Sequence, residues 1–366
     1  MTDPQHRRPR VIVCDSIADE GIEVLSGHFD VDVRTGLSEE ELAATIPDYE
    51  AMVVRSATKV TSRILDRAER LQVIARAGAG LDTIDVSAAV DRDIEIVNAP
   101  DANTLAVAEL TIGLLVALAR NVTRGDAALK EGRWIKKELL GSGLAGKTLG
   151  IVGFGRIGQA VASRARAFGM RILTNQRRPT PELYLEAGVE PVDLYDLLAE
   201  SDFVTLHVPA RPDTHGLIGV EELATMKPTA YLVNTSRGSV VDEDALLAAL
   251  EEGGIAGAAL DVFAEEPASD SPLARHPRVI ATPHIGASTA DAQSTAAVQV
   301  AEELVRRLGG KAARSILPLR FVPLERVVPH EAVDPRRSER LATRLQEDGV
   351  IRNPTVVAAI GERFVV

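Results

Sequence analysis

Short apolar runs alternate with helical patterns along most of the chain, and this alternation restricts its fold more than any other feature. Val11–Cys14 is an apolar run followed by a helical pattern over residues 17–25, and the alternation continues through the first hundred residues. It starts again at Thr148–Val152 and continues to residue 281. Short β-branched runs between helices indicate βαβ units and parallel sheets. The sequence therefore predicts an α/β fold with two doubly wound, Rossmann-like domains.

The final fifty residues follow a different pattern. Residues 316–328 are interrupted by prolines, residues 335–348 form a charged helical pattern, and residues 356–359 and 364–366 are apolar. We expect a small, incomplete α+β appendage here. The predicted strands elsewhere lie at residues 11–14, 31–33, 51–54, 73–75, 94–97, 148–152, 171–174, 203–207, 231–234, 258–261 and 279–281. The main predicted helices lie at 17–25, 39–46, 64–68, 104–121, with Thr104 as its N-cap, and 290–308.

A glycine-rich turn, GFGRIG at residues 153–158, follows one predicted strand and opens a helical pattern. This context indicates a dinucleotide site: Gly153 permits the tight turn, Gly155 lets the backbone approach a pyrophosphate, and Gly158 packs helix on strand. Free N–H groups and the dipole at the helix start favour the anion. We assign Arg156 and Ile157 to the same site. The alternative is a glycine-rich βα turn that binds nothing.

The end of the next strand sets the choice of cofactor. An NAD site places a carboxylate there to bind the ribose 2′-hydroxyl, whereas this chain has Gln176, Arg177 and Arg178. Arginine binds a 2′-phosphate through charge-assisted hydrogen bonds. The sequence therefore allows NAD or NADP and favours NADP. The alternative is that both arginines are solvated loop charges.

Composition excludes several classes of protein. The chain has 366 residues and a formal net charge of −12. A nucleic-acid binder needs a basic surface, so we expect no nucleic-acid partner. The polar N-terminus has no signal core, and the longest apolar stretch, around residues 110–119, is too short to span a bilayer. We expect a cytoplasmic protein with no membrane partner and no metal site. The one cysteine, Cys14, lies in an apolar run, which favours a buried structural thiol over a reactive one.

Three loops that follow predicted strands carry candidate chemistry: Arg237 in NTSRG, Glu266 in DVFAEEP and His284 in PHIGAST. Ligands of open α/β sheets bind outside the carboxyl ends of the strands, so these loops should meet in one crevice. Reduction of a 2-keto acid needs a cation for the carboxylate and carbonyl, which suits Arg237. It needs a proton donor near neutral pH, which suits His284, and a carboxylate to orient and charge that imidazole, which suits Glu266. Each residue alone is more simply explained by an ion pair or a cap.

The motifs resemble those of the D-isomer-specific 2-hydroxyacid dehydrogenase family. The resemblance runs from about Val11 to Ile316 and rests on GFGRIG, NTSRG, the DVFxxEP pattern and PHIGAST. It implies that Arg237, Glu266 and His284 form the catalytic set, with Glu266 preferred over Glu265. Further cofactor contacts that it implies are Val208, Thr235, Ser236, Asp261 on the nicotinamide side, and Gly286.

The resemblance also implies where the substrate binds and how the domains divide. Main-chain N–H groups of the turn Gly78-Ala79-Gly80 would hold the substrate carboxylate, with Arg55 and Ser56 lining the cleft and Asn103 near it. Residues 10–100 and 290–316 would form the substrate domain, and residues 101–289 the dinucleotide-binding domain, leaving 317–366 as the appendage. The family's usual homodimer, formed through the helix near 104–121, is a further expectation.

Within the family, VRSATKV at 54–60, RAGAG at 76–80 and WIKK at 134–137 resemble the branch that acts on 3-phosphoglycerate and 3-phosphohydroxypyruvate. Arg55 and the basic cluster at 133–137 would bind the phosphate. Gln176 departs from that branch and instead resembles NADP-using hydroxypyruvate or glyoxylate reductases. A dinucleotide-sensing corepressor, which some relatives of the fold are, is the alternative outside enzymes.

Residues 319–366 resemble the start of a ParB-like fold, particularly its free-serine kinase branch. The resemblance rests on VPLERVVPHE at 322–331, DGV at 348–350 and NP at 353–354. The Asp-Gly-x-x-Arg run that binds nucleotide in that fold would lie just past Val366. We therefore expect this segment to give the chain neither kinase nor DNA-binding activity.

Overall fold

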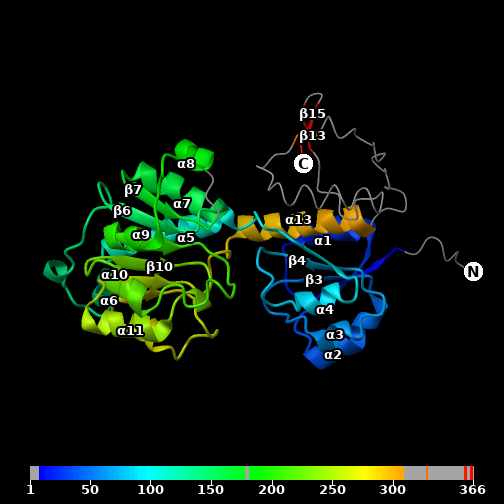
Figure 1. Cartoon of the computed structure of the whole chain (residues 1–366). Helices are drawn as coiled ribbons and strands as arrows, with labels where there is room; N and C mark the ends of the chain where they lie inside the picture. The colour runs from blue at the N-terminus through cyan, green and yellow to red at the C-terminus, as the bar shows by residue number, and fades with distance from the viewer. Residues whose placement is uncertain (1–7, 178–180, 309–326, 329–357, 361–362, 366) are drawn as a thin grey trace, which may run out of the picture. The chain divides into compact units, whose positions relative to one another are not determined.

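The computed structural model describes residues 8–177 and 181–308, together with three short strands near the C-terminus (Figure 1). The chain divides into two compact units, residues 1–309 and residues 310–366. The first unit contains two parallel sheets, as the alternation of apolar runs predicts. The predicted fold class is therefore confirmed.

The first sheet has five parallel strands in the order β2-β1-β3-β4-β5. Its strands are β1 (Arg10–Val13), β2 (Asp30–Val33), β3 (Ala51–Val54), β4 (Val73–Arg76) and β5 (Glu95–Asn98). The helices that belong to it are α1 (Asp19–His28), α2 (Glu39–Thr45), α3 (Ser62–Leu65), α4 (Val86–Val90) and α13 (Ala290–Leu308). α2, α3 and α4 bury one face of the sheet, and α1 and α13 bury the other.

Helix α13 joins the first sheet although it follows the second in sequence. It packs beside α1 and against β4 and β5 (Figure 1). Ala296, Val300 and Leu304 of α13 are buried together with Val11 of β1. The helices approach closely at Gly21, where an added Cβ would lie 2.7 Å from the Cβ of Ala297. The apolar stripe of α13 thus completes the core of the first sheet.

The second sheet has seven parallel strands in the order β12-β11-β10-β9-β6-β7-β8. Its strands are β6 (Thr148–Val152), β7 (Arg171–Asn175), β8 (Glu190–Pro191), β9 (Phe203–Leu206), β10 (Tyr231–Asn234), β11 (Gly257–Leu260) and β12 (Val279–Ala281). The helices around it are α5 (Thr104–Ala119), α6 (Val122–Lys130), α7 (Arg156–Ala167), α8 (Pro181–Ala187), α9 (Leu194–Glu200), α10 (Val220–Thr225), α11 (Glu243–Glu252) and α12 (Pro272–Arg275). In the described parts of both domains, single-turn 3₁₀ helices lie at Ile46–Asp48, Lys136–Glu138 and Gly238–Val240. Helices α5, α7 and α8 cover one face, and α9, α10 and α11 cover the other.

The start of α5 differs from the prediction. Asn103, not Thr104, is the N-cap, because the carbonyl of Asn103 accepts the first helical hydrogen bond, from the N–H of Val107 at 3.0 Å. The predicted helix 104–121 ends at Ala119, and α6 follows after a left-handed residue at Asn121.

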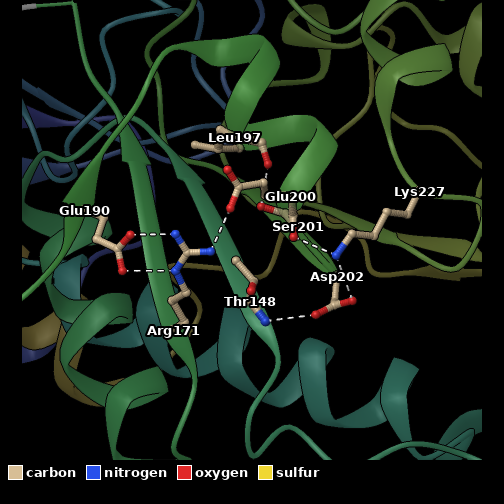
Figure 2. A network of polar contacts seen from close by, with 8 residues as sticks. All are labelled: Thr148, Arg171, Glu190, Leu197, Glu200, Ser201, Asp202 and Lys227. Atoms are coloured by element: carbon tan, nitrogen blue, oxygen red, sulfur yellow. Dashed lines mark hydrogen bonds and ion pairs between the residues drawn. The ribbon is translucent and has the colours of Figure 1, made fainter.

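Charged side chains tie together the strand ends that lie opposite the carboxyl edge of the second sheet (Figure 2). Arg171 at the start of β7 donates from two nitrogens to Glu190 at 3.0 and 2.6 Å. Asp202, just before β9, accepts from the N–H of Thr148 at 2.9 Å and from Lys227 at 3.2 Å. Although partial burial acts to raise the pKa of Asp202, these two hydrogen bonds lower it below its usual range. This network fixes the amino ends of the strands and leaves the carboxyl edge for ligands.

The described part of the second unit is a three-stranded sheet in the order β13-β15-β14. Its strands are β13 (Val327–Val328), β14 (Ala358–Ile360) and β15 (Arg363–Val365), with β13 parallel and β14 antiparallel to β15. The strands predicted at 356–359 and 364–366 overlap β14 and β15. The helix predicted at 335–348 lies outside the described residues, and the ParB-like resemblance stays a prediction.

Within the part of the chain that the structure describes, no single helix has both the length and the apolar character to cross a membrane. Helices α5 and α6 meet the two criteria only when taken together, and they are bent by 67° at the break between them.

Candidate active site

The carboxyl edge of the second sheet collects the loops that the sequence singles out. The chain runs from β6 outward through β7 to β8, and then returns to β9 on the other side of β6. The order therefore reverses between β6 and β9, and ligands of open α/β sheets bind at such a switch point. The loops after β10, β11 and β12 lie along the same edge.

The glycine-rich turn follows β6 and has the shape that a pyrophosphate site requires. Gly153 has φ 95°, and an added Cβ would lie 2.5 Å from the carbonyl oxygen of His207. A Cβ on Gly158 would strike the carbonyl of Gly153, so α7 packs closely on the turn. A Cβ on Gly155 would meet open space. The open N-terminus of the 12-residue helix α7 therefore fits a dinucleotide phosphate.

Gln176 and Arg177 follow β7 beside this turn. The Oε1 atom of Gln176 is buried and has no hydrogen-bond partner among the described residues. Arg177 is exposed, and its Nη1 donates to Asp213 at 2.5 Å. Arg178 lies outside the described residues. No carboxylate follows β7 directly at the positions that the structure describes, and the carboxylate beside Arg177 comes from the loop after β9.

Other residues assigned to the cofactor follow β9 and β10 or lie at the start of α7. Val208 lies against Gly153, with Cγ1 2.9 Å from the position of an added Cβ. Thr235 and Ser236 are buried, and Thr235 shares a hydrogen bond of 2.9 Å with Thr111 of α5. Arg156, at the start of α7, forms an ion pair with Asp101, and its neighbour Ile157 is partly buried.

Asp261 is buried at the end of β11 and organises the loop after β12. Its Oδ1 accepts from the hydroxyl of Thr282 at 2.6 Å and from the N–H of Ile285 at 2.8 Å, and its Oδ2 accepts from the N–H of Gly286 at 2.8 Å. The carboxylate thus binds the Thr282 side chain before His284 and the backbone directly after it. In this structure Asp261 positions the loop, a role that the sequence did not suggest.

Glu266 and His284 are in direct contact. Nδ1 of His284 lies 2.8 Å from Oε2 of Glu266, with side chains 50% and 37% exposed. The other oxygen of Glu266 accepts from the N–H of Phe263 at 3.1 Å, which fixes the carboxylate. His284 has φ 53°, in the left-handed region that residues other than glycine rarely adopt. Its backbone N–H donates to the carbonyl of Asp261 at 2.8 Å.

The loop that carries Arg237 follows β10. Buried Asn234 shapes it, because its Oδ1 accepts from the N–H and hydroxyl of Ser236 and its amide donates to the carbonyl of Arg237 at 2.9 Å. Gly238 lies directly against the backbone of Phe263, where any Cβ would overlap. This contact brings the Arg237 loop against the Glu266 loop.

The guanidinium of Arg237 binds Asp82, a residue that the sequence did not single out. Nε donates to Oδ2 of Asp82 at 3.0 Å, Nη2 lies 2.8 Å from the same oxygen in an ion pair, and Nη1 donates to the carbonyl of Ser236 at 2.7 Å. A Cβ on Gly80 would overlap both partners, so a larger residue there would displace this ion pair. Asp82 and Arg237 are 155 positions apart, and no local pattern links them.

The loops of the first sheet that the family resemblance assigns to substrate are also firmly held. The carbonyl of Ala79 accepts from the amide of Asn98 at 2.7 Å. Buried Asp15 accepts from the N–H of Arg55 at 2.5 Å, which fixes the loop that contains Arg55 and exposed Ser56. Hydrogen bonds in both loops therefore hold these segments in place.

Arg76, the last residue of β4, is a further basic group that the sequence did not assign individually. Its Nε is buried and has no partner among the described residues. Burial lowers its pKa, and the nearby positive charges of Arg55 and Arg237 act in the same direction, while Asp15 and Asp82 oppose them. The side chain of Arg76 lies against Gly78, where an added Cβ would be 2.5 Å from Nη1. Three arginines thus influence one another around the 78–80 turn.

Asn103 and the basic cluster at residues 133–137, which were also expected to contact the substrate, have different surroundings. The Oδ1 of Asn103 is buried without a hydrogen-bond partner in the described chain, which leaves an acceptor free at the start of α5. In the basic cluster at 133–137, Arg133 is bound by Glu131 at 2.9 Å, and Trp134 is largely exposed.

Cys14 is buried as predicted, and burial raises the pKa of its thiol to about 12. Within the described ranges, no group of three or more His, Cys, Asp or Glu side chains could hold a metal ion.

A parallel sheet with a glycine-rich turn at its switch point defines a dinucleotide-binding protein of the Rossmann type. A family model described as the NAD-binding domain of D-isomer specific 2-hydroxyacid dehydrogenases matches residues 112–286. The glyoxylate reductase of Paecilomyes thermophila superposes with a TM-score of 0.76 at 32% identity, over 83% of this chain and 96% of that one. The chain belongs to the D-isomer specific 2-hydroxyacid dehydrogenase family, and the resemblance drawn from its motifs is confirmed.

Two other similarities concern the substrate and the cofactor. D-3-phosphoglycerate dehydrogenase of Methanocaldococcus jannaschii is 47% identical over 319 residues, 87% of this chain and 61% of that protein. The chain thus spans about three fifths of the length of that curated relative. The NADPH-dependent glyoxylate/hydroxypyruvate reductase of Sinorhizobium meliloti, solved with NADP and malonate, has a TM-score of 0.72 and 32% identity over 82% of this chain and 93% of that one.

Proposed function

We propose that the chain is a D-2-hydroxyacid dehydrogenase that interconverts a small D-2-hydroxy acid and its 2-keto acid with a nicotinamide dinucleotide. The observation that carries this proposal is the 2.8 Å contact between His284 and Glu266, on loops after adjacent strands at the edge that holds the glycine-rich turn. Arg237 follows the next strand of the same sheet. A carboxylate–histidine pair beside a dinucleotide site is typical of acid–base catalysis coupled to redox chemistry.

His284 moves the proton in this proposal. Because Glu266 occupies Nδ1, that nitrogen carries a proton and Nε2 is left to give a proton to the substrate oxygen or take one from it. Bound nicotinamide would supply or accept the hydride at C2. Glu266 stabilises the imidazolium that forms when the substrate hydroxyl is oxidised, and it keeps the ring oriented.

Arg237 holds the substrate carboxylate and polarises the carbonyl. Its hydrogen bonds to Asp82 and Ser236 use two of the five guanidinium N–H groups, one on Nε and one on Nη1. Nη1 and Nη2 keep further hydrogens, and a carboxylate binds such a pair in bidentate fashion. The main-chain N–H groups of residues 78–80 would hold the same carboxylate from the first sheet.

For the cofactor we propose NADP in preference to NAD. The glycine-rich turn and the start of α7 would hold the pyrophosphate, with Val208, Thr235, Ser236 and Gly286 around them. Arg177 beside uncharged Gln176 supports a 2′-phosphate, and the Sinorhizobium reductase is named as NADPH-dependent.

For the substrate we propose 3-phosphoglycerate and 3-phosphohydroxypyruvate. The name of the Methanocaldococcus relative supports this choice, and Arg55 and Arg76 near the 78–80 turn provide positive charge for a phosphate. Hydroxypyruvate or glyoxylate is the second candidate, favoured by the names of the two reductases. We also propose a homodimer in which the segment after α5, with exposed Trp134 and Leu140, is covered by a second copy.

The proposed activity is tested by the absorbance of NADPH and NADH at 340 nm against a panel of 2-keto acids. We expect turnover, with 3-phosphohydroxypyruvate preferred over hydroxypyruvate and glyoxylate. His284→Gln should lower kcat by about 10²–10⁴-fold because the proton donor is lost. His28→Gln, a change at an exposed histidine at the end of α1, is the control. Tight dinucleotide binding without turnover of any 2-keto acid would support a sensor and contradict the proposal.

A further inference from the structure

The loop after β9 carries two charged residues that meet the loop after β7. Arg177 donates from Nη1 to Oδ2 of Asp213 at 2.5 Å. Arg211 lies at the other oxygen of the same carboxylate, with Nε 3.3 Å from Oδ1. One carboxylate therefore holds two guanidinium groups that come from two different loops.

This group borders the glycine-rich turn. Strands β7 and β9 are the two neighbours of β6, and the turn follows β6. The β9 loop begins against the turn, because an added Cβ on Gly153 would lie 2.5 Å from the carbonyl oxygen of His207. The Arg177–Asp213 pair thus joins the two loops that flank the turn. A ligand group at the end of β7 would reach it.

The charge and the exposure of the group suit a doubly charged anion. Two guanidinium groups and one carboxylate carry a formal net charge of +1, and all three side chains are roughly half exposed or more. A hollow of about 600 Å³ opens beside Arg211. A phosphate monoester brings nearly two negative charges and three acceptor oxygens, so it binds a pair of arginines better than one carboxylate does.

We propose that Arg177, Arg211 and Asp213 form the subsite that selects the substituent at the ribose 2′ position of the dinucleotide. The proposal rests on the proposed dinucleotide-linked function and deepens it. Asp213 is the specificity-determining residue. It neutralises both arginines when the substituent is a hydroxyl group, and it releases them to a 2′-phosphate. Asp213 thereby weakens the preference for NADP over NAD.

The test measures binding to the whole chain by isothermal titration calorimetry. The probes are NADPH and NADH, together with the fragments 2′,5′-ADP and 5′-AMP, which differ by the 2′-phosphate. The variants are Asp213→Asn and Arg211→Gln. Asp270→Asn is the matched control, because it removes the carboxylate of another exposed arginine pair, Asp270–Arg275, which lies beside α12.

Asp213→Asn should tighten NADPH and 2′,5′-ADP about fivefold, which is the effect of one exposed ion pair. NADH and 5′-AMP should be unchanged. Arg211→Gln should weaken NADPH and 2′,5′-ADP by about five- to tenfold and leave NADH and 5′-AMP unchanged, since it removes one charge-assisted contact. The control should leave all four affinities as in the wild type.

The outcomes separate this inference from the proposed function. If both dinucleotides bind and the two variants change the NADPH-to-NADH ratio no more than Asp270→Asn does, the subsite is excluded. The subsite is also excluded if the two variants change only the midpoint of thermal unfolding and leave the binding affinities unchanged. If no 2-keto acid is turned over, the proposed function fails, while a shift between 2′,5′-ADP and 5′-AMP still supports the subsite.

Discussion

Arg237 illustrates how a single side chain is aimed before a ligand arrives. Asp82 takes its Nε edge and the carbonyl of Ser236 takes one hydrogen of Nη1, so the guanidinium plane is fixed from two sides. Its side chain is 32% exposed, so part of the guanidinium faces solvent. Asp82 is thus a positioning residue in the proposed reaction, since it acts through Arg237 and touches no reacting atom.

Asp82→Ala should lower kcat/KM about tenfold, because Arg237 loses the acceptor that orients it. A charge-assisted hydrogen bond contributes about 1.5–3 kcal/mol when shielded, and exposure of Asp82 reduces that value. Asp82→Asn keeps an oxygen acceptor and should recover most of the loss, which a general structural defect would not allow. The measurement is kcat/KM from steady-state kinetics of the wild type, Asp82→Ala and Asp82→Asn. Equal kcat/KM for Asp82→Ala and the wild type would show that Asp82 does not position Arg237.

His207, just past β9, makes folding depend on pH. Burial lowers the pKa of its imidazole from 6.5 to about 3, and its Nδ1 is buried without a partner among the described residues. Below pH 6.5 the unfolded chain therefore binds a proton that the folded chain refuses. The part of the free energy of unfolding that depends on neutral His207 is therefore fully present above the pKa of histidine in the unfolded chain. It is lost as the pH falls towards the pKa of His207 in the folded chain, with a slope of up to about 1.4 kcal/mol per pH unit.

We expect the urea midpoint of the wild type to fall between pH 7.5 and pH 5 more steeply than that of His207→Gln. Carboxylates contribute equally to both slopes, so the difference belongs to His207. Parallel pH profiles of the two proteins would contradict the assignment.

At the scale of elements, loops after neighbouring strands are held together by backbone contacts that only glycine allows. Gly238 lies against the backbone of Phe263 and Ala264, which brings the Arg237 loop onto the loop that ends in Glu266. Asp261 then links the β11 end to the His284 loop through two backbone N–H groups. The three proposed catalytic side chains thus depend on one stack of loops.

Gly238→Ala should destabilise the fold by about 1–3 kcal/mol and lower kcat/KM, because the new methyl overlaps backbone atoms that cannot rotate away. Gly27→Ala is the matched control. A Cβ at that position of α1 meets no atom within 4 Å, and alanine stabilises a helix more than glycine does. Denaturant unfolding and kinetics of both variants are the measurements. An unchanged midpoint for Gly238→Ala would mean that the loops can separate without cost.

Element types were predictable because they depend on local patterns. The apolar runs predicted as strands in the two large sheets coincide with strands, because parallel strands buried on both faces are almost continuously apolar. The two-residue strand β8 has no apolar run and was not predicted. Short elements such as α4, five residues capped by Asp85, escaped prediction because one turn leaves little periodicity. The N-cap of α5 was misplaced by one residue, since Asn103 and Thr104 are both plausible caps.

The site was predictable only in part, for a related reason. Residues named by their position after a strand, such as Glu266 and His284, could be found because strand ends are local features. The charged partners of the candidate site residues could not be found from the sequence. Asp82 meets Arg237 across 155 positions, and Asp213 meets Arg177 across 36, so only the folded chain brings them together. Asp261 was assigned to the cofactor from family resemblance, and its bonds to the His284 loop appear only in three dimensions.

At the scale of the whole molecule, the chain passes from the first sheet to the second and back. Helix α5 precedes the second sheet, and α13 follows the His284 loop and returns to the core of the first sheet. Every residue proposed for substrate, cofactor or catalysis therefore lies within residues 1–309. The unit at 310–366 supplies none of them.

Removal of residues 310–366 should therefore leave a folded protein with the same dinucleotide affinity and the same kcat/KM. Among the described residues, the members of the four apolar clusters of the two large sheets all lie between residues 11 and 308, so truncation at residue 309 removes none of these members. Thermal unfolding, calorimetric titration with NADPH and turnover of 3-phosphohydroxypyruvate by the two proteins test this. A chain cut instead before α13, at residue 289, is the matched control and should fail to fold, since Ala296, Val300 and Leu304 would leave the first core. Loss of turnover after removal of residues 310–366 alone would show that the second unit takes part in catalysis.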